Sequence, residues 1–377
     1  MTERSYFEPG LESLRGIAAL GVAFTHSHMV FNLTSSNYAK LGDIRDWLFW
    51  SLPSGGSVIV FFALSGYVLS LAIERERNWL AFVVRRMFRI LPALWVAVAA
   101  MFFAELLLIP HLRADDFHPW FTSSFFNAPT WGDFWLNLFL FKTNIDQVAW
   151  SLAPEMVWSL VLPIAAWLHY RGNIVLQLAA LAVLTWMGYR SAHPYIQFAV
   201  AFYAGFFVPR EILVPFLHRR PVVAVLAVIA GWALLCYGSF ILVAYTPPMR
   251  VFCAMAAVIV ISGVVAAGRF MAPLRAALPR FLGRVSYSFY LLHPPTLFCL
   301  SAVAALWPVA KPHDMLGAFV LSATSIILAL GVSAACYYWV EIPAIGIGKR
   351  AVDWLKPIDQ TRLPTISSTP PPDTVTP

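Results

Sequence analysis

Long apolar runs alternate with short polar segments along almost the whole chain. A helix needs roughly 20 mainly apolar residues to cross a bilayer, and ten runs approach that length, the sixth being the shortest. We therefore expect membrane-spanning helices at about 14–33, 56–73, 88–109, 150–169, 173–190, 195–208, 221–244, 250–267, 285–307 and 316–340. Segment 131–141 (WGDFWLNLFLF) is apolar but too short to cross, which predicts an interfacial or re-entrant helix.

The composition narrows the fold class. Hydrophobic residues make up 60% of the chain and charged residues only 12%, whereas soluble domains carry about 25% charged residues. A soluble protein with a very large core would need far more charge on its surface. The chain is therefore predicted to be an all-α polytopic membrane protein with about ten transmembrane helices.

The placement of the basic residues indicates an orientation. With the N-terminus in the cytoplasm, 19 of the 26 Lys and Arg residues fall on the cytoplasmic side, as the positive-inside rule requires. This bias predicts that both termini are cytoplasmic. A nucleic-acid-binding protein would gather its basic residues on a soluble face, so the lipid bilayer is the expected partner and nucleic acid is not.

We expect one membrane domain at 8–345 and a Pro/Ser/Thr-rich, disordered cytoplasmic tail at 346–377. Acidic residues dilute the basic flank of the first apolar run and no clear cleavage site follows it, so it is predicted to be a retained span. The four cysteines are Cys236, Cys253, Cys299 and Cys336. They lie inside apolar runs without the paired spacing of metal ligands, which predicts core residues and no metal site.

Arg15 and His26 stand eleven residues apart in the first run, a helical rise of roughly 16 Å. With Arg15 at the cytoplasmic membrane face, His26 lies near mid-bilayer, where a titratable group is costly and therefore a candidate functional residue. The structural alternative is that Arg15 anchors the helix at the membrane face and His26 is a hydrogen-bonded packing residue. His28 is a competitor nearer the outer face, but depth and spacing from Arg15 favour His26.

Small and basic motifs follow in the next two runs. Ser65 and Gly66 form a small pair that lets helices approach closely, and the Ser65 hydroxyl can bond across the interface. Arg85, Arg86 and Arg89 are predicted just before the third span, and their fork geometry suits phosphate groups. The alternative for Ser65 and Gly66 is a purely structural role in helix packing. The alternative for the three arginines is that they set the topology and bind lipid headgroups.

Three further motifs place polar groups at the ends of runs. Trp150 precedes Glu155 at the outer start of the fourth run, where a carboxylate could orient a histidine or form a structural ion pair. His293 lies a couple of turns into the ninth run. The same predicted helix carries the candidate site residues Ser286, Tyr287 and Tyr290. Glu341, two residues before Pro343 at the end of the tenth run, is expected to pair with loop arginines.

In this order, these stretches resemble the motifs of the acyltransferase-3 family of integral membrane acyltransferases. The matching pieces are Arg15-x10-His26, Phe61-Phe62-x-x-Ser65-Gly66, Arg85-Arg86-x-x-Arg89-x-x-Pro92, Trp150-Ser151-Leu152-x-x-Glu155, Ser286-Tyr287-Ser288-x-Tyr290-Leu291-Leu292-His293 and Glu341-x-Pro343. Each piece is weak alone, but six in the right order over about residues 8–345 form a specific pattern.

The resemblance implies transfer of an acyl group, usually acetyl, from cytoplasmic acyl-CoA to a hydroxyl of a carbohydrate or glycoconjugate. Exopolysaccharide and lipopolysaccharide are examples of such acceptors, and the bacterial inner membrane is the expected location. Acetyl-CoA would be a donor substrate and not a permanently bound cofactor. Many relatives carry an extra extracytoplasmic domain, which we do not expect here, so a separate periplasmic partner protein remains open.

The resemblance also implies roles for the motif residues. His26 would be the catalytic histidine, acting as a general base or as a transient acyl carrier, with Glu155 and His293 completing the catalytic set. Residues expected to hold the donor are Arg15, Arg85, Arg86 and Arg89. Residues expected to contact substrate are Ser65, Trp150, Ser286, Tyr287 and Tyr290.

A second class of function is a proton-coupled transporter or flippase of a glycolipid or polar substrate. In that case His26 and Glu155 would form a proton relay within the membrane. The sequence shows no inverted repeat and its arginines cluster on one side, and both observations favour the acyltransferase.

Overall fold

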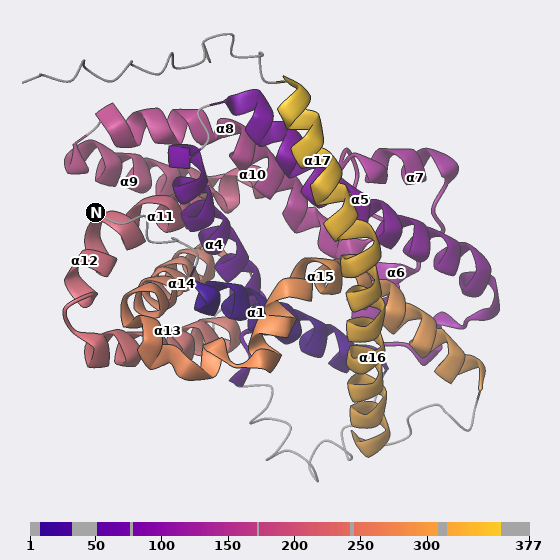
Figure 1. The fold of residues 1–377 in the computed structure, drawn as a ribbon. Helices are drawn as coiled ribbons and strands as arrows, with labels where there is room; N and C mark the ends of the chain where they lie inside the picture. Colours follow the sequence, from indigo (N-terminus) through magenta and orange to yellow (C-terminus); the bar gives the residue numbers. More distant parts are fainter. Residues whose placement is uncertain are drawn as a thin grey trace, which may run out of the picture.

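Helices form nearly all of the fold in a computed structural model that describes residues 8–31, 51–75, 78–171, 173–241, 245–307 and 315–355 (Figure 1). The helices, in chain order, are α1 (Pro9–His28), α4 (Ser54–Arg75), α5 (Trp79–Leu108), α6 (Pro119–Phe125), α7 (Trp131–Leu138), α8 (Leu152–Arg171), α9 (Ile174–Arg190), α10 (Pro194–Gln197), α11 (Ala199–Val208), α12 (Val214–Leu217), α13 (Pro221–Ile241), α14 (Pro247–Ala267), α15 (Ala277–Leu306), α16 (Met315–Cys336) and α17 (Ile342–Leu355). Short 3-10 or π turns join several of them, including η3 (Gln147–Ser151) and η6 (Tyr337–Glu341). Within the described ranges, the extended pairing is an isolated bridge between Phe31 and Phe117. The predicted all-α class is confirmed.

Each predicted span falls on a helix or on consecutive helices. Among the described residues, seven helical stretches are long and apolar enough to cross a membrane. They are Gly55–Ala72, Trp79–His111, Pro194–Leu217, Pro221–Phe240, Pro247–Arg275, Ala277–Leu306 and Leu316–Trp354. The other three predicted spans fall on α1, α8 and α9, of which α9 is a shorter apolar helix. The number of ten spans therefore stays a prediction.

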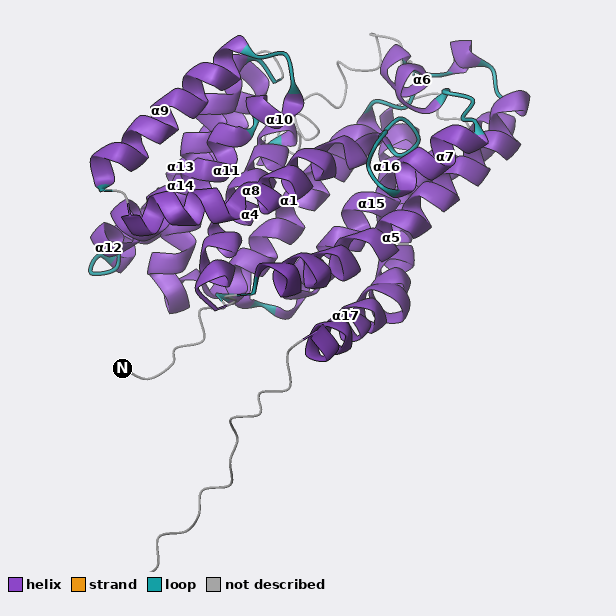
Figure 2. Ribbon diagram, turned by 90° about the horizontal axis from the view of Figure 1, so that it is seen from above, coloured by secondary structure: helices purple, strands orange, loops and turns teal. Residues whose placement is uncertain are grey.

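Short helices lie at both ends of the helix bundle. Figure 2 shows α6 and α10 at one end and α12 and α17 at the other. The sequence assigns the first pair to the outer side and the second pair to the cytoplasmic side. Which end faces the cytoplasm stays a prediction.

Large apolar side chains cover the outward faces of several helices. Val222 on α13 is 69% exposed, Ile327 on α16 is 68% exposed and Trp186 on α9 is 65% exposed. Soluble proteins bury most side chains of this kind, whereas lipid chains are as apolar as the side chains themselves. The seven long apolar helices and these exposed faces are consistent with a polytopic membrane protein.

Helices α4 and α11 cross where each carries a glycine. A Cβ atom at Gly66 would lie 1.9 Å from the carbonyl oxygen of Phe202, and one at Gly205 would lie 2.0 Å from the carbonyl oxygen of Ala63. Neither position therefore tolerates a side chain without separating the helices. This crossing confirms the packing role predicted for the Ser65-Gly66 pair.

Helices α1 and α15 also cross at two glycines. A Cβ atom at Gly16 would lie 2.5 Å from the backbone nitrogen of Gly283, and one at Gly283 would lie 2.3 Å from the carbonyl oxygen of Glu12. The two backbones are thus almost in contact near the start of both helices. Because α1 carries His26 and α15 carries His293, this crossing brings the two histidine-bearing helices together.

The C-terminal boundary differs from the expected one at residue 345. Helix α17 runs from Ile342 to Leu355, directly after the π turn η6, and forms part of the helical stretch Leu316–Trp354. Pro343 has no backbone N–H to donate, and it follows directly on the π turn η6, where the regular α-helical hydrogen-bond pattern is already interrupted. Gly348 packs against Phe88 of α5, since a Cβ atom there would lie 2.7 Å from the Phe88 Cβ atom. Residues 346–355 are therefore helical, and the rest of the predicted tail, 356–377, lies outside the described residues.

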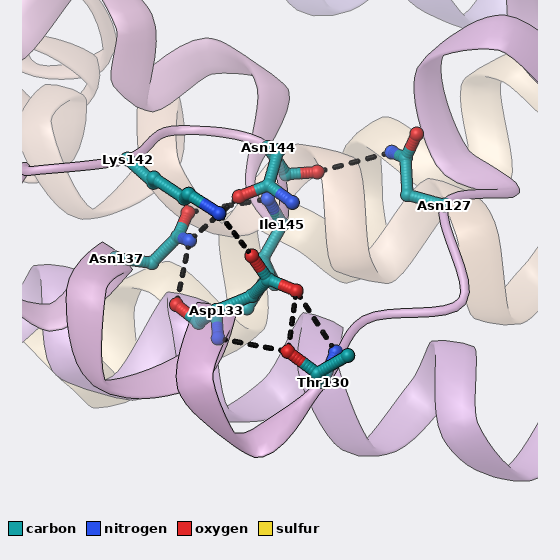
Figure 3. A network of polar contacts seen from close by, with 7 residues as sticks. All are labelled: Asn127, Thr130, Asp133, Asn137, Lys142, Asn144 and Ile145. Atoms are coloured by element: carbon teal, nitrogen blue, oxygen red, sulfur yellow. Dashed lines mark hydrogen bonds and ion pairs between the residues drawn. The ribbon is translucent and has the colours of Figure 1, made fainter.

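The segment between α6 and α8 is held by a polar network around α7 (Figure 3). The Thr130 side chain caps α7 by accepting from the Asp133 backbone N–H, and the Asp133 carboxylate accepts from the Thr130 backbone N–H and the Lys142 ammonium. The Asn137 side chain donates to Asn144 and accepts from the Ile145 backbone N–H. The short helix predicted at 131–141 is present, and its position at a membrane interface stays a prediction.

Candidate active site

Two histidines from distant parts of the chain meet between α1 and α15. The Nδ1 atom of His26 lies 3.1 Å from the Nε2 atom of His293. His26 is partly exposed, whereas only 3% of the surface of His293 is exposed. Helix α1 is continuous from Pro9 to His28, so Arg15 and His26 share one helix as predicted. The structure thus brings together two of the three predicted catalytic residues.

The hydrogen bonds around the pair indicate which nitrogen carries each proton. The Nδ1 atom of His293 lies 3.2 Å from the carbonyl oxygen of Phe289, and a carbonyl oxygen only accepts, so this nitrogen donates. In a neutral imidazole the second nitrogen is then an acceptor. His26 Nδ1 donates to His293 Nε2, which leaves a lone pair on His26 Nε2. The pair can therefore take up a proton at one defined atom.

Glu155, the third predicted catalytic residue, bonds to groups other than the histidines. Its Oε1 atom accepts from Arg86 Nη2 and from Ser65 Oγ, each at 2.6 Å. The side chains of Arg86 and Glu155 are 15% and 21% exposed, so the ion pair is largely enclosed. Among the described residues, the structure supports the ion-pair alternative for Glu155.

This ion pair also shows that Arg86 and Glu155 lie at the same level, although the sequence places them on opposite sides of the membrane. Glu155 was expected at the outer start of a span and Arg86 just before a span on the cytoplasmic side. The structure places Arg86 inside α5, which begins at Trp79 and not near residue 88. It also places Glu155 in the first turn of α8, after the buried residues Ile145 and Val148. Helix α8 thus begins inside the protein, at the level of the arginines.

Other charged groups surround the same ion pair. The charges of Arg89, Glu155 and Arg86 act on the Arg15 guanidinium, which ties α1 electrostatically to α5 and α8. Arg89 is exposed, Arg15 is partly exposed, and Arg85 is a partly exposed residue of α5 one turn before Arg89. The predicted arginines thus gather around one region, together with Glu155 and Ser65.

Glu341 belongs to this region as well. It is 3% exposed and accepts a hydrogen bond of 2.9 Å from Ser288 Oγ of α15. The charges of Arg89 and Arg15 act on its carboxyl group. The sequence predicts loop arginines as partners of Glu341, but Arg89 and Arg15 lie inside α5 and α1.

The remaining predicted site residues line α15 and its neighbours. The Tyr290 hydroxyl lies 2.9 Å from Ser151 Oγ, the Tyr287 hydroxyl donates to the Ile90 carbonyl oxygen at 2.7 Å, and the Ser286 hydroxyl donates to the Gly283 carbonyl oxygen in its own helix. Tyr290 also lies beside the histidine pair, with its ring centroid 6.0 Å from that of His293. Trp150 packs against Phe198 and Tyr245, with ring centroids 5.3 Å and 5.6 Å away. The contacts of Ser286 and Trp150 are local ones, and their predicted role in substrate binding stays a prediction.

A tryptophan that sequence reasoning missed covers His26. The ring centroid of Trp120, on α6, lies 4.9 Å from that of His26. Trp120 lies in an aromatic-rich loop, and no local signal distinguishes it from the other tryptophans there. Within the described residues, no group of three or more His, Cys, Asp or Glu side chains could hold a metal ion.

Comparison with known proteins bears on what these groups do. Among the similar curated proteins, nodulation protein 10 of Rhizobium leguminosarum bv. viciae is 28% identical over 188 residues, which cover 46% of this chain and 49% of that protein. An O-acetyl transferase of Shigella phage Sf6 is 40% identical over 63 residues, which cover 16% of this chain and 19% of that protein. The alignments thus span about half, or less, of each relative's length. No solved structure matches this chain significantly.

The comparison with protein families covers much more of the chain. Residues 8–338 match the acyltransferase domain of the acyltransferase-3 family. The match includes both histidines, all four predicted donor-binding arginines and Glu155. The chain therefore belongs to the acyltransferase-3 family.

Proposed function

We propose that this protein is a membrane-embedded O-acyltransferase of the bacterial inner membrane. It moves an acyl group, acetyl in the first instance, from cytoplasmic acyl-CoA to a hydroxyl of a carbohydrate or glycoconjugate acceptor. Family membership supports the reaction class, and the similarity to a phage O-acetyl transferase supports the acetyl group. The single observation that carries the proposal is the hydrogen-bonded pair of His26 and His293.

The pair supplies the base that the reaction needs. His26 Nε2 takes the proton of the acceptor hydroxyl while the hydroxyl oxygen attacks the thioester carbonyl carbon. The carbon–sulfur bond then breaks, and the CoA thiolate leaves and takes up the proton. His293 keeps His26 in the required tautomer and stabilises the positive charge that His26 carries between the two proton transfers. This division makes His26 the base and His293 its positioning residue.

The arginine cluster supplies the donor site. Arg15 precedes His26 by eleven residues of one helix, a rise of roughly 16 Å, which suits a donor whose phosphates and thioester are separated by a long arm. Exposed Arg89 and partly exposed Arg15 and Arg85 suit the phosphates of CoA. Arg86 and Glu155 bind each other, so we assign them to holding α5 against α8 beneath the donor.

Replacing His26 with alanine tests the proposal. Membranes that contain the His26→Ala variant and the native acceptor should transfer no label from labelled acetyl-CoA above the background of membranes without the protein. The matched control is His28→Ala on the same helix, because His28 Nδ1 bonds to the Phe24 carbonyl oxygen of its own helix. His28→Ala should transfer at close to the wild-type rate. A wild-type rate of transfer by a well-folded His26→Ala protein would contradict the assignment of His26 as the base.

A further inference from the structure

The connecting segment that contains α6 pairs with the residues that directly follow α1, just beyond His26. The His118 backbone N–H donates to the Val30 carbonyl oxygen at 2.9 Å. Phe31 and Phe117 form an antiparallel bridge, and their rings stack with centroids 5.2 Å apart. Because Val30 and Phe31 follow His26 on the chain while Arg15 precedes it, this attachment lies on the side of the histidine away from the arginine cluster.

The same segment is fastened to α15 just beyond His293. Phe121 and Phe125 of α6 are fully buried, and their ring centroids lie 6.1 Å and 6.2 Å from that of Phe298. Phe298 follows His293 by five residues on α15. Helix α6 therefore packs on α15, while the residues just before α6 pair with the residues just after α1.

These two attachments place the Trp120 indole on His26. The ring centroids are 4.9 Å apart with an angle of 41° between the planes. The start of α6 is fixed by the Trp120 backbone N–H, which donates to His118 Nδ1 at 3.2 Å. Trp120 is partly exposed, unlike the phenylalanines that anchor its helix, and its ring shields one side of His26, which is itself partly exposed.

A base in this position faces a competing reaction. The base that removes the proton of an acceptor hydroxyl also removes one from water. Water oxygen then attacks the thioester carbonyl carbon, the carbon–sulfur bond breaks, and the products are a free carboxylic acid and CoA thiol. Enzymes suppress such hydrolysis by closing the site to water. An apolar ring packed on the base is a direct way to do so.

We propose that Trp120 is a specificity-determining residue that keeps water from His26 and so favours the acceptor hydroxyl over water. This inference rests on the proposed acyl transfer. It assigns to α6 a task at the acceptor side of the site, separate from the donor-holding arginines. Removing the indole should open His26 to water while leaving donor binding intact.

The test is the ratio of hydrolysis to transfer. Membranes that contain the protein and its native acceptor receive acetyl-CoA labelled in the acetyl group, and label is counted as free acetate and as acylated glycoconjugate after subtracting membranes without the protein. Trp120→Ala should raise the ratio of acetate to glycoconjugate at least tenfold, with an unchanged KM for acetyl-CoA. The matched control is Trp135→Ala, which removes a 60% exposed tryptophan of α7 in the same connecting segment and should leave the ratio unchanged.

Two outcomes would overturn the inference. One is a Trp120→Ala protein that elutes from a sizing column like wild type and shows the wild-type ratio. If Trp120→Ala does not fold, Trp120→Leu replaces it as the test, because leucine retains apolar bulk but not the flat ring. A severalfold rise in the ratio of acetate to glycoconjugate supports the inference. The other outcome that would overturn it is an unchanged ratio in Trp120→Leu. Absence of transfer by the wild-type protein contradicts the proposed function instead, so the two failures are distinguishable.

Discussion

Single residues define the chemistry of this site through their hydrogen-bond partners. A lone imidazole can act as a base at either nitrogen, but the bonds from His26 to His293 and from His293 to Phe289 leave one basic atom. Glu155 shows the reverse: a carboxylate that could have oriented a histidine is bound instead to Arg86 and Ser65. The partner of the base is therefore a second histidine, in place of the more familiar carboxylate.

Replacing His293 tests the role of that partner. His293→Ala should lower kcat about a hundredfold with little change in the KM for acyl-CoA, because the donor site lies around the arginines. His293→Gln should recover part of the lost rate, since its side-chain oxygen can accept the hydrogen bond from His26 Nδ1. The measurement is steady-state kinetics of both variants in detergent or nanodiscs. Equal rates for alanine and glutamine would show that the hydrogen bond is not what His293 contributes.

Pairs of helices position the reacting groups. The crossing of α1 and α15 at Gly16 and Gly283 places the histidines side by side several turns further along. The packing of α6 on α15 places Trp120 against His26. The ion pair between α5 and α8 fixes the region where the arginines gather. The histidine pair, the ring against His26 and the arginine region thus each depend on a contact between helices that are far apart in the sequence.

Widening the α1–α15 crossing should uncouple the histidines. Gly283→Val introduces a side chain whose Cβ atom would lie 2.3 Å from the Glu12 carbonyl oxygen, an overpacking that typically costs 1–3 kcal/mol. We expect a lower Tm and at least a tenfold loss of acyl transfer. The control is Gly331→Ala on α16, where a Cβ atom meets nothing within 4 Å. Thermal unfolding and transfer assays check both, and a Gly283→Val protein with wild-type values would refute the crossing.

The network at α7 predicts a pH dependence of stability. Hydrogen bonds from the Lys142 ammonium and from Thr130 hold the pKa of the Asp133 carboxyl well below its usual range. Because the pKa is depressed in the folded state, the stabilisation is fully present above the ordinary aspartate pKa of about 3.9 and is lost as the pH falls toward the folded pKa. Asp133→Asn should therefore lower the Tm by a similar amount at pH 7 and pH 5, and the difference should narrow below about pH 4. A difference that already disappears at pH 5 would contradict the assigned bonds.

At the scale of the whole molecule, the sequence predicts the elements better than it predicts which of them meet. Every predicted span falls on a helix, because a long apolar run is a property of one segment and lipid requires its backbone to be helical. Which segments contact each other depends on tertiary packing, and the residue pattern of one segment does not predict it. The depth of Glu155, the helical continuation through residues 346–355 and the position of Trp120 on His26 all arise from such contacts.

The family resemblance supplies part of this information about which segments meet. It predicts that both histidines belong to one site, and in the structure His26 Nδ1 lies 3.1 Å from His293 Nε2. It did not separate Glu155 from the histidines or add Trp120, since a motif records which residues recur and not which atoms touch. Of the two predicted partners of the base, the geometry therefore pairs His293 with His26 and Glu155 with Arg86.

We expect His26 to carry out the acylation of a cell-surface glycoconjugate. Mass spectrometry of surface glycans tests it most directly, in cells with the gene deleted and then complemented by wild type, His26→Ala or His28→Ala. An acyl mass, that of acetyl in the first instance, should disappear on deletion, return with wild type and His28→Ala, and stay absent with His26→Ala. Glycans with the same acyl content in all four strains would contradict it.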